Sequence, residues 1–69
     1  MESIKQVVAE ALREALKDSG LTQKEVGSKL NVGEPTVSKY LSGNQNLTLE
    51  TIDEIAKALG LKVKVTFYK

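Results

Sequence analysis

Polar side chains that can recognise the edges of nucleic-acid bases cluster between Glu34 and Lys39, in the sequence EPTVSK. Lys39 can donate to guanine O6 or N7, and Glu34 can accept a hydrogen bond from cytosine N4. Thr36 and Ser38 can donate or accept, whereas Pro35 offers only an apolar contact, for example to a thymine methyl group. The competing interpretations are an ordinary solvated lysine at position 39 and a carboxylate at position 34 that only stabilises a helix N-terminus.

Phosphate contacts are expected on either side of this cluster. Thr22 and Gln23 stand where a second helix begins, so their side chains and the free N–H groups of its first turn can meet a phosphate. The loop from Gly43 to Asn46 offers uncharged donors at Asn44 and Asn46, although a solvated turn explains that loop equally well.

Residue types that carry most catalysis and metal binding are missing. The chain has no Cys and no His, and it has no glycine-rich phosphate loop. Its carboxylates fall at helix-surface spacing rather than in a ladder that could hold a metal ion. We therefore expect no enzyme activity, no metal and no cofactor.

Length and charge set further limits. The 69 residues allow one domain, residues 1–69, with a small core that a partner subunit would help to stabilise. The net charge is only +1, which is weak for a nucleic-acid-binding domain. There is neither a signal peptide nor an apolar run long enough for a membrane span, so we expect a cytoplasmic protein with no membrane partner.

The first helix should begin after Ser3, with Gln6 completing a capping box, and end at Gly20. Its apolar residues follow helical spacing and predict one buried face: Ile4, Val7, Val8, Ala11, Leu12, Ala15 and Leu16.

A helix-turn-helix unit is predicted over about residues 22–41. Thr22 and Glu25 form a capping box, and the helix that they open should end at Leu30, before Asn31, which tolerates positive φ. Gly27 costs roughly 1 kcal/mol in a helix interior relative to Ala, which indicates that a neighbouring helix crosses there at close range. Pro35 fits the first turn of the next helix.

A fourth helix should follow the N-cap Thr48 and end at Gly60. Its expected inner face consists of Leu49, Ile52, Ile55, Ala56 and Leu59.

The last residues change to a period of two, which predicts a β-strand over residues 61–68. A lone strand needs a partner for its backbone groups, so we expect antiparallel pairing with the same strand of a second copy. The residues facing the helices in this homodimer would be Leu61, Val63, Val65 and Phe67. The alternatives are a disordered tail, or a strand that packs on its own helices and serves only a toxin.

Over roughly residues 5–60 the chain resembles the Xre family of helix-turn-helix regulators, to which the phage repressors and Cro proteins belong. The similarity is carried by LTQKEVGSKLNV, TVSKYLSG and LTLETIDEIAKALG. It implies an all-α, five-helix repressor-like DNA-binding domain, here with a short C-terminal strand, that binds double-stranded DNA as a dimer. By position, Glu34, Pro35, Ser38 and Lys39 would read bases and Gln23 would clamp a phosphate. Many members have Gly where Asn31 stands, and Gln, Arg or Ser where Pro35 stands.

The segment LSGNQNLTLETI followed by a strand resembles the antitoxin subset of this family, whose members repress their own operon and neutralise a toxin. The sequence thus predicts a sequence-specific transcriptional regulator, most simply a repressor, with a cognate toxin as a further partner. The alternative is a protein-interaction module that keeps the fold without binding DNA.

Overall fold

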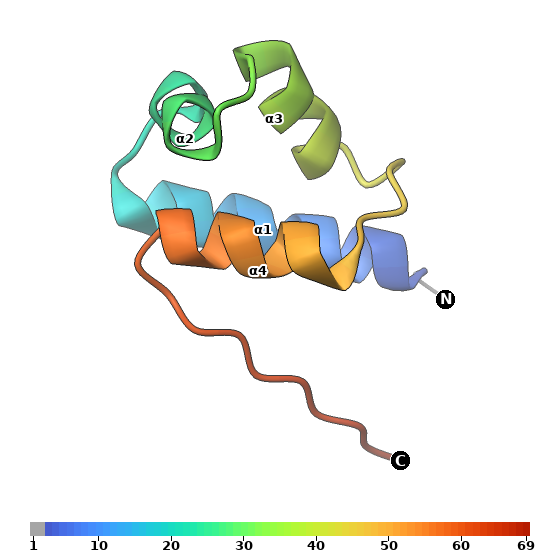
Figure 1. Cartoon of the computed structure of the whole chain (residues 1–69). Coiled ribbons are helices and arrows are strands. Elements are labelled where there is room, and N and C mark those ends of the chain that lie inside the picture. The colour runs from blue at the N-terminus through green and yellow to red at the C-terminus, as the bar shows by residue number, and fades with distance from the viewer. Residues whose placement is uncertain (1–2) are drawn as a thin grey trace.

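The computed structural model describes residues 3–69 and contains four helices within them. These are α1 (Ile4–Ser19), α2 (Gln23–Leu30), α3 (Glu34–Leu41) and α4 (Leu49–Ala58). In Figure 1, α1 and α4 run in the same direction on one side, and α2 and α3 cover them on the other. Helix α2 packs against both α3 and α4, and α1 packs against α3.

The expectation of five helices and a strand is therefore wrong for residues 3–69, which form four helices and no strand. Residues 61–69 have no regular secondary structure and lie exposed. The β-branched residues Val63, Val65 and Thr66 favour an extended chain over a fifth helix. A strand needs a hydrogen-bonded neighbour, and the rest of this copy offers none beside residues 62–69.

The helix boundaries follow the capping residues. At α2 the capping box is complete: the Glu25 N–H donates to Thr22 Oγ1 at 3.1 Å, and the Thr22 N–H donates to Glu25 Oε1 at 3.0 Å. At α1 only half of the expected box forms, because Ser3 accepts from the Gln6 N–H at 3.4 Å without a return bond from the Gln6 side chain. Thr48 caps α4 as expected, accepting from the Thr51 N–H at 3.1 Å.

The turn between α2 and α3 is as tight as the sequence predicts. Asn31 adopts the left-handed conformation with φ 59°, and the Val32 N–H returns to the Gly27 carbonyl at 2.9 Å. A Cβ atom on Gly27 would lie 2.8 Å from the Val32 carbonyl oxygen and 3.5 Å from Val37 Cγ2. Only glycine fits there without a backbone shift, because the carbonyl of the turn lies so close; position 27 also faces Val37 of α3, as predicted, at an ordinary contact distance.

The core joins all four helices through five buried side chains: Leu12, Val26, Val37, Leu41 and Ile55. Val26 is the most deeply buried large side chain, with 2% of its surface exposed. The guanidinium of Arg13 also crosses from α1 and donates to the Leu41 carbonyl, which satisfies a backbone acceptor at the end of α3.

Four residues expected on inner faces are exposed instead. Leu49 is 83% exposed, Ile4 73% and Val7 45%, and Ala11 is exposed as well. Successive helix residues turn by about 100°, so the wide apolar stripe of α1 has two halves. Helices α2 and α3 cover the half with Leu12, and the half with Ile4 and Val7 stays open.

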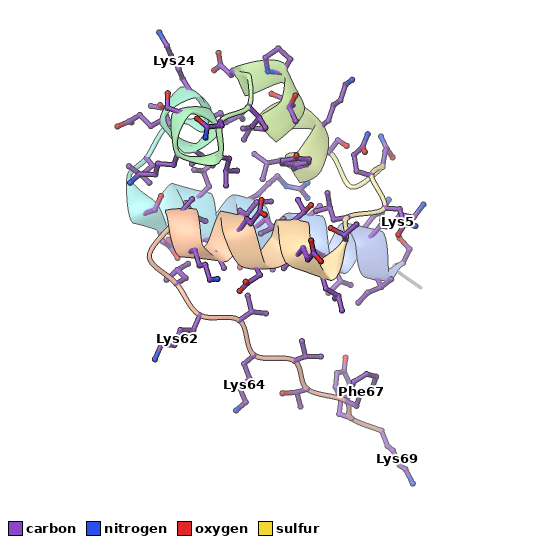
Figure 2. All side chains as sticks on the ribbon, viewed as in Figure 1. Lys5, Lys24, Lys62, Lys64, Phe67 and Lys69 are labelled. Carbon is purple, nitrogen blue, oxygen red and sulfur yellow. The ribbon has the colours of Figure 1, made fainter. Side chains whose placement is uncertain are left out.

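The chain leaves the core at Leu61, whose N–H donates to the Ala56 carbonyl at 2.8 Å. From there it runs away from the helices as an extended tail (Figure 1). Lys62 and Lys64 project from one side of the tail and Phe67 from the other, so the expected alternation is present without the strand (Figure 2). None of the helices in residues 3–69 is long and apolar enough to cross a membrane.

Candidate nucleic-acid interface

Helix α3 presents the polar residues predicted to read bases. Its buried side is held by Val37 and Leu41, so residues on the opposite side face solvent. The exposed residues are Glu34, Pro35, Ser38 and Lys39, whereas Thr36 is half-buried and less available than the sequence suggested.

The start of α3 is built by residues with fixed backbone preferences. Gly33 is the N-cap in an extended conformation, without a side-chain hydrogen bond, and Pro35 lies in the first turn. The first-turn N–H groups of α3 are therefore not covered by a capping side chain. Glu34 places a negative charge at this positive helix end, which stabilises the helix but would repel a phosphate.

Gln23 at the start of α2 is joined directly to α3. The Ser38 hydroxyl donates to Gln23 Oε1 at 2.6 Å. This bond occupies the amide oxygen and leaves the two N–H donors of the Gln23 side-chain amide to face a ligand. The structure thus brings together a predicted phosphate contact and a predicted base contact, which the sequence placed 15 positions apart.

Thr22 lies beside Gln23 but its hydroxyl oxygen already accepts the capping bond from the Glu25 N–H. In return, the Thr22 backbone N–H donates to the Glu25 carboxylate. This bond, followed by the contact with the Thr22 side chain, lowers the pKa of Glu25 below its ordinary value of 4.5. Glu25 is therefore a stable negative charge on the first turn of α2. Any phosphate held there must be attracted by the donors of Gln23, by the hydroxyl hydrogen of Thr22 and by nearby lysines.

The loop after α3 is anchored at Gly43, which is buried with φ 86° against α1. A Cβ atom on Gly43 would lie 3.4 Å from Gln6 Cγ and 3.7 Å from Ala9 Cβ. The Asn44 backbone N–H donates to Ser42 Oγ at 3.1 Å, and Asn44 itself is exposed. Asn46 is also exposed. Both asparagines follow the C-terminal end of α3, whereas Gln23 is bonded to Ser38 within α3.

Two lysines that the sequence interpretation did not single out lie near these contacts. Lys24 follows Gln23 in the first turn of α2 and projects away from α1 and α4 (Figure 2). Lys5 precedes Gln6, the residue against which the loop packs (Figure 2). Adjacency to Gln23 could have indicated Lys24, but only the fold places Lys5 near the loop.

The charged side chains of α3 do not form ion pairs within residues 3–69. Within residues 3–69 the ion pair found is Asp53 with Lys57 on α4, at 3.1 Å and well exposed. Lys39 makes no ion pair there, so its ammonium group is available to a base or a phosphate. The described part of the chain also has no cluster of three or more potential metal ligands.

A helix crossed closely by its predecessor, with a buried apolar side and an exposed polar side, defines the helix-turn-helix class of DNA-binding domains. The family described as Helix-turn-helix (HTH_3), which contains the Xre and Cro types, matches residues 12–65. This chain belongs to that family, which is a family of DNA-binding transcriptional regulators rather than enzymes. No curated protein and no solved structure gives a match.

Proposed function

We propose that the chain is a sequence-specific repressor that lays α3 in the major groove of double-stranded DNA. The observation that carries the proposal is the exposed polar side of α3, held beside Gln23 by the 2.6 Å bond from Ser38. Lys39 would donate to guanine, Glu34 would accept from cytosine, and Pro35 would contact a thymine methyl group. Bound at a promoter, such a protein excludes other proteins from the same DNA.

Backbone contacts would fix the orientation of α3 in the groove. The free amide donors of Gln23, together with the hydroxyl hydrogen of Thr22, would bind one phosphate at the start of α2. Asn44 and Asn46 would bind a second phosphate beyond the other end of α3. Two clamps on either side of the helix give it one register on the duplex.

The low charge favours action as a dimer. A domain with a net charge of +1 gains little from counterion release, so one copy alone binds DNA weakly. We propose that two copies pair through residues 61–68, with Leu61, Val63, Val65 and Phe67 turned toward the helices. The two α3 helices would then meet half-sites about one helical turn apart.

The direct test is selection from a randomised duplex library at two salt concentrations, in the cytoplasm-like range and below it. We expect an enriched two-fold related sequence, with affinity that falls as salt is raised. Failure to enrich any sequence at low salt would overturn the proposal.

Substitution of Lys39 sharpens the same test. Lys39→Ala should weaken binding to the selected site by about 1–3 kcal/mol and relax the preference at one base position. Lys57→Ala is a matched control, because Lys57 lies on α4 and already pairs with Asp53. A loss that is uniform over all sequences would instead make Lys39 a phosphate contact.

The exposed apolar tail favours a second candidate function, in which the chain binds another protein, such as a toxin, without binding DNA. Salt dependence separates the two functions, since a protein-only module would give no DNA binding at any salt concentration. A partner that copurifies with the full chain but not with a chain lacking residues 62–69 would support the second function.

A further inference from the structure

Helix α1 carries an apolar stripe that the core does not use. Ile4 is 73% exposed and Val7 45%, and Ala11 and Ala15 continue the same side toward the C-terminal end of the helix. The spacing of these residues places them on one face, next to but distinct from the face that Leu12 buries. Exposed apolar residues aligned on a face mark an interaction surface more than scattered ones do.

The C-terminal half of this stripe forms the floor of a groove of about 350 Å³. Ala11 and Ala15 line it from α1, and Leu59 and Leu61 line it from the end of α4. The polar lining consists of Glu14, Asp18 and Ser19, of which Glu14 and Asp18 are exposed. The groove is thus apolar along its floor and acidic along its edge.

The tail after Leu61 has the complementary character. Its apolar residues are largely uncovered, from 51% exposure at Val63 to 94% at Phe67. Lys62 and Lys64 project from the opposite side of the extended chain (Figure 2). The tail therefore offers an apolar face to the floor and positive charges to an acidic edge.

The dimensions also agree. From Ile4 to Asp18 the stripe rises about 21 Å at the helical spacing of 1.5 Å per residue. Residues 62–69 in extended form reach about 23 Å at roughly 3.3 Å per residue. One tail can therefore run along the whole stripe.

The tail of the same copy cannot fill this groove. Leu61 forms part of the groove wall and is tied to Ala56, and the chain then runs away from the helices (Figure 1). To return, it would need a tight turn, but residues 62–69 (KVKVTFYK) contain none of the turn-forming residues Gly, Pro, Asn or Asp. The groove is open to a tail from another molecule.

We propose that the α1 groove and the stripe leading to Ile4 bind the tail of a second copy of this chain. Two-fold symmetry makes the exchange reciprocal, so each tail covers the other copy's α1 and the assembly closes at two. This inference rests on the proposed dimer and adds the surface that receives the tails. The flexible stems of Lys62 and Lys64 allow their ammonium groups to approach Glu14 and Asp18 of the other copy.

Charge reversal in two separate chains tests the proposal. The groove variant carries Glu14→Lys and Asp18→Lys, and the tail variant carries Lys62→Glu and Lys64→Glu. Each variant alone would set like charges against each other and should raise the dimer dissociation constant at least about tenfold at low salt. A mixture of the two variants should form heterodimers, because both of its tail–groove contacts join opposite charges again.

A matched control is Glu50→Lys with Glu54→Lys on α4, which changes the charge by the same amount outside the groove. This control should dimerise like the wild type. Masses are measured in solution without DNA, so the result does not depend on whether the protein binds DNA. Helical circular dichroism verifies that each variant is folded, and all four substituted side chains are exposed.

Restored association in the mixture, and in one chain that carries all four reversals, would support the proposal. A groove variant that dimerises like the wild type would overturn it, even if loss of the tail abolishes the dimer, because the tails would then pair only with each other. A wild-type chain that stays monomeric, or a mixture as monomeric as its components, would overturn it as well.

Discussion

The helix-turn-helix unit and the tail differ in how many of their contacts are made within one copy of the chain. Between α2 and α3 the key residues contact each other directly. Gly27 packs against the Val32 carbonyl, and the Ser38 hydroxyl donates to the Gln23 amide oxygen. In the tail, Leu61 makes the last backbone hydrogen bond and Phe67 is 94% exposed. The proposed DNA-binding surface is therefore already formed within one copy, whereas the tail after Leu61 makes no backbone hydrogen bond within residues 3–69.

This difference implies that one region determines the folding stability of the monomer and the other determines the proposed association of two copies. The side chains that fold the domain lie in residues 8–59, so the tail contributes little to the free energy of folding of a monomer. The tail can then be altered without loss of the fold, and the unit cannot. Changes in the tail should therefore affect assembly most, and changes in the unit should affect stability most.

Ending the chain at Leu61 should abolish the dimer and leave the helices intact. Leu61 keeps its bond to Ala56, so the truncated chain should retain its helical circular dichroism. Affinity for the selected two-fold DNA site should fall by about 10²–10⁴, since the second half-site no longer adds to the first. Mass in solution and DNA titration measure the two effects, and an undiminished dimer would contradict the division.

Gly27→Leu should have the largest effect on stability. A side chain at position 27 must displace the Val32 carbonyl, since even Cβ would lie 2.8 Å from its oxygen. Overpacking of this kind costs about 1–3 kcal/mol, which a thermal or urea unfolding curve detects. Gly27→Ala should destabilise too, although Ala is normally the better helix residue.

Ser28→Ala provides the matched control for position 27, because Ser28 is the exposed neighbour on the same helix. It should leave the unfolding midpoint nearly unchanged. If Gly27→Leu had the same unfolding midpoint as the wild type, the crossing of α2 and α3 would be misplaced.

Gln23→Ala and Ser38→Ala should act on DNA binding as one unit. Ser38 orients the Gln23 amide through the 2.6 Å bond, so removing either partner loosens the same phosphate contact. The double variant should lose about 0.5–3 kcal/mol less binding free energy than the sum of the single variants. Additive losses in a double-mutant cycle would show that the two side chains contact DNA independently.

The smallest predicted effect is a dependence of stability on pH at Glu25. Its pKa is lowered in the folded state by the bonds from Thr22, so its contribution is complete above the ordinary value of 4.5. That contribution is lost as the pH falls through the lowered value. The difference in unfolding midpoint between the wild type and Glu25→Gln should therefore shrink in acid, and a constant difference would argue against the capping carboxylate.

Local signals in the sequence were sufficient for the helix-turn-helix unit. The Thr22 capping box, the left-handed Asn31 and the close crossing at Gly27 each depend on residues within a few positions of one another. Such short-range chemistry can be recognised without knowledge of the rest of the fold. The bond between Ser38 and Gln23 could not be foreseen, because it depends on the angle at which the two helices cross.

The errors arose where burial depends on distant elements. Ile4, Val7 and Leu49 have the periodicity of an inner face, but periodicity does not specify how much of an apolar face another element will cover. The fifth helix came from the resemblance, and the β-branched tail residues after Leu61 do not form it. A β-strand needs a neighbouring strand for its backbone hydrogen bonds. The period-two pattern of the tail does not show whether such a neighbour is present.

The bond from Arg13 to the Leu41 carbonyl connects α1 to both of the proposed interactions. Helix α1 holds the end of α3, which is proposed to read DNA, and it carries the groove proposed for the second copy's tail. The two binding events are then thermodynamically linked: whatever factor tail docking contributes to DNA affinity, DNA must contribute to tail docking. The operator would thus promote assembly of its own repressor, and occupancy would rise more sharply with protein concentration than for two independent copies.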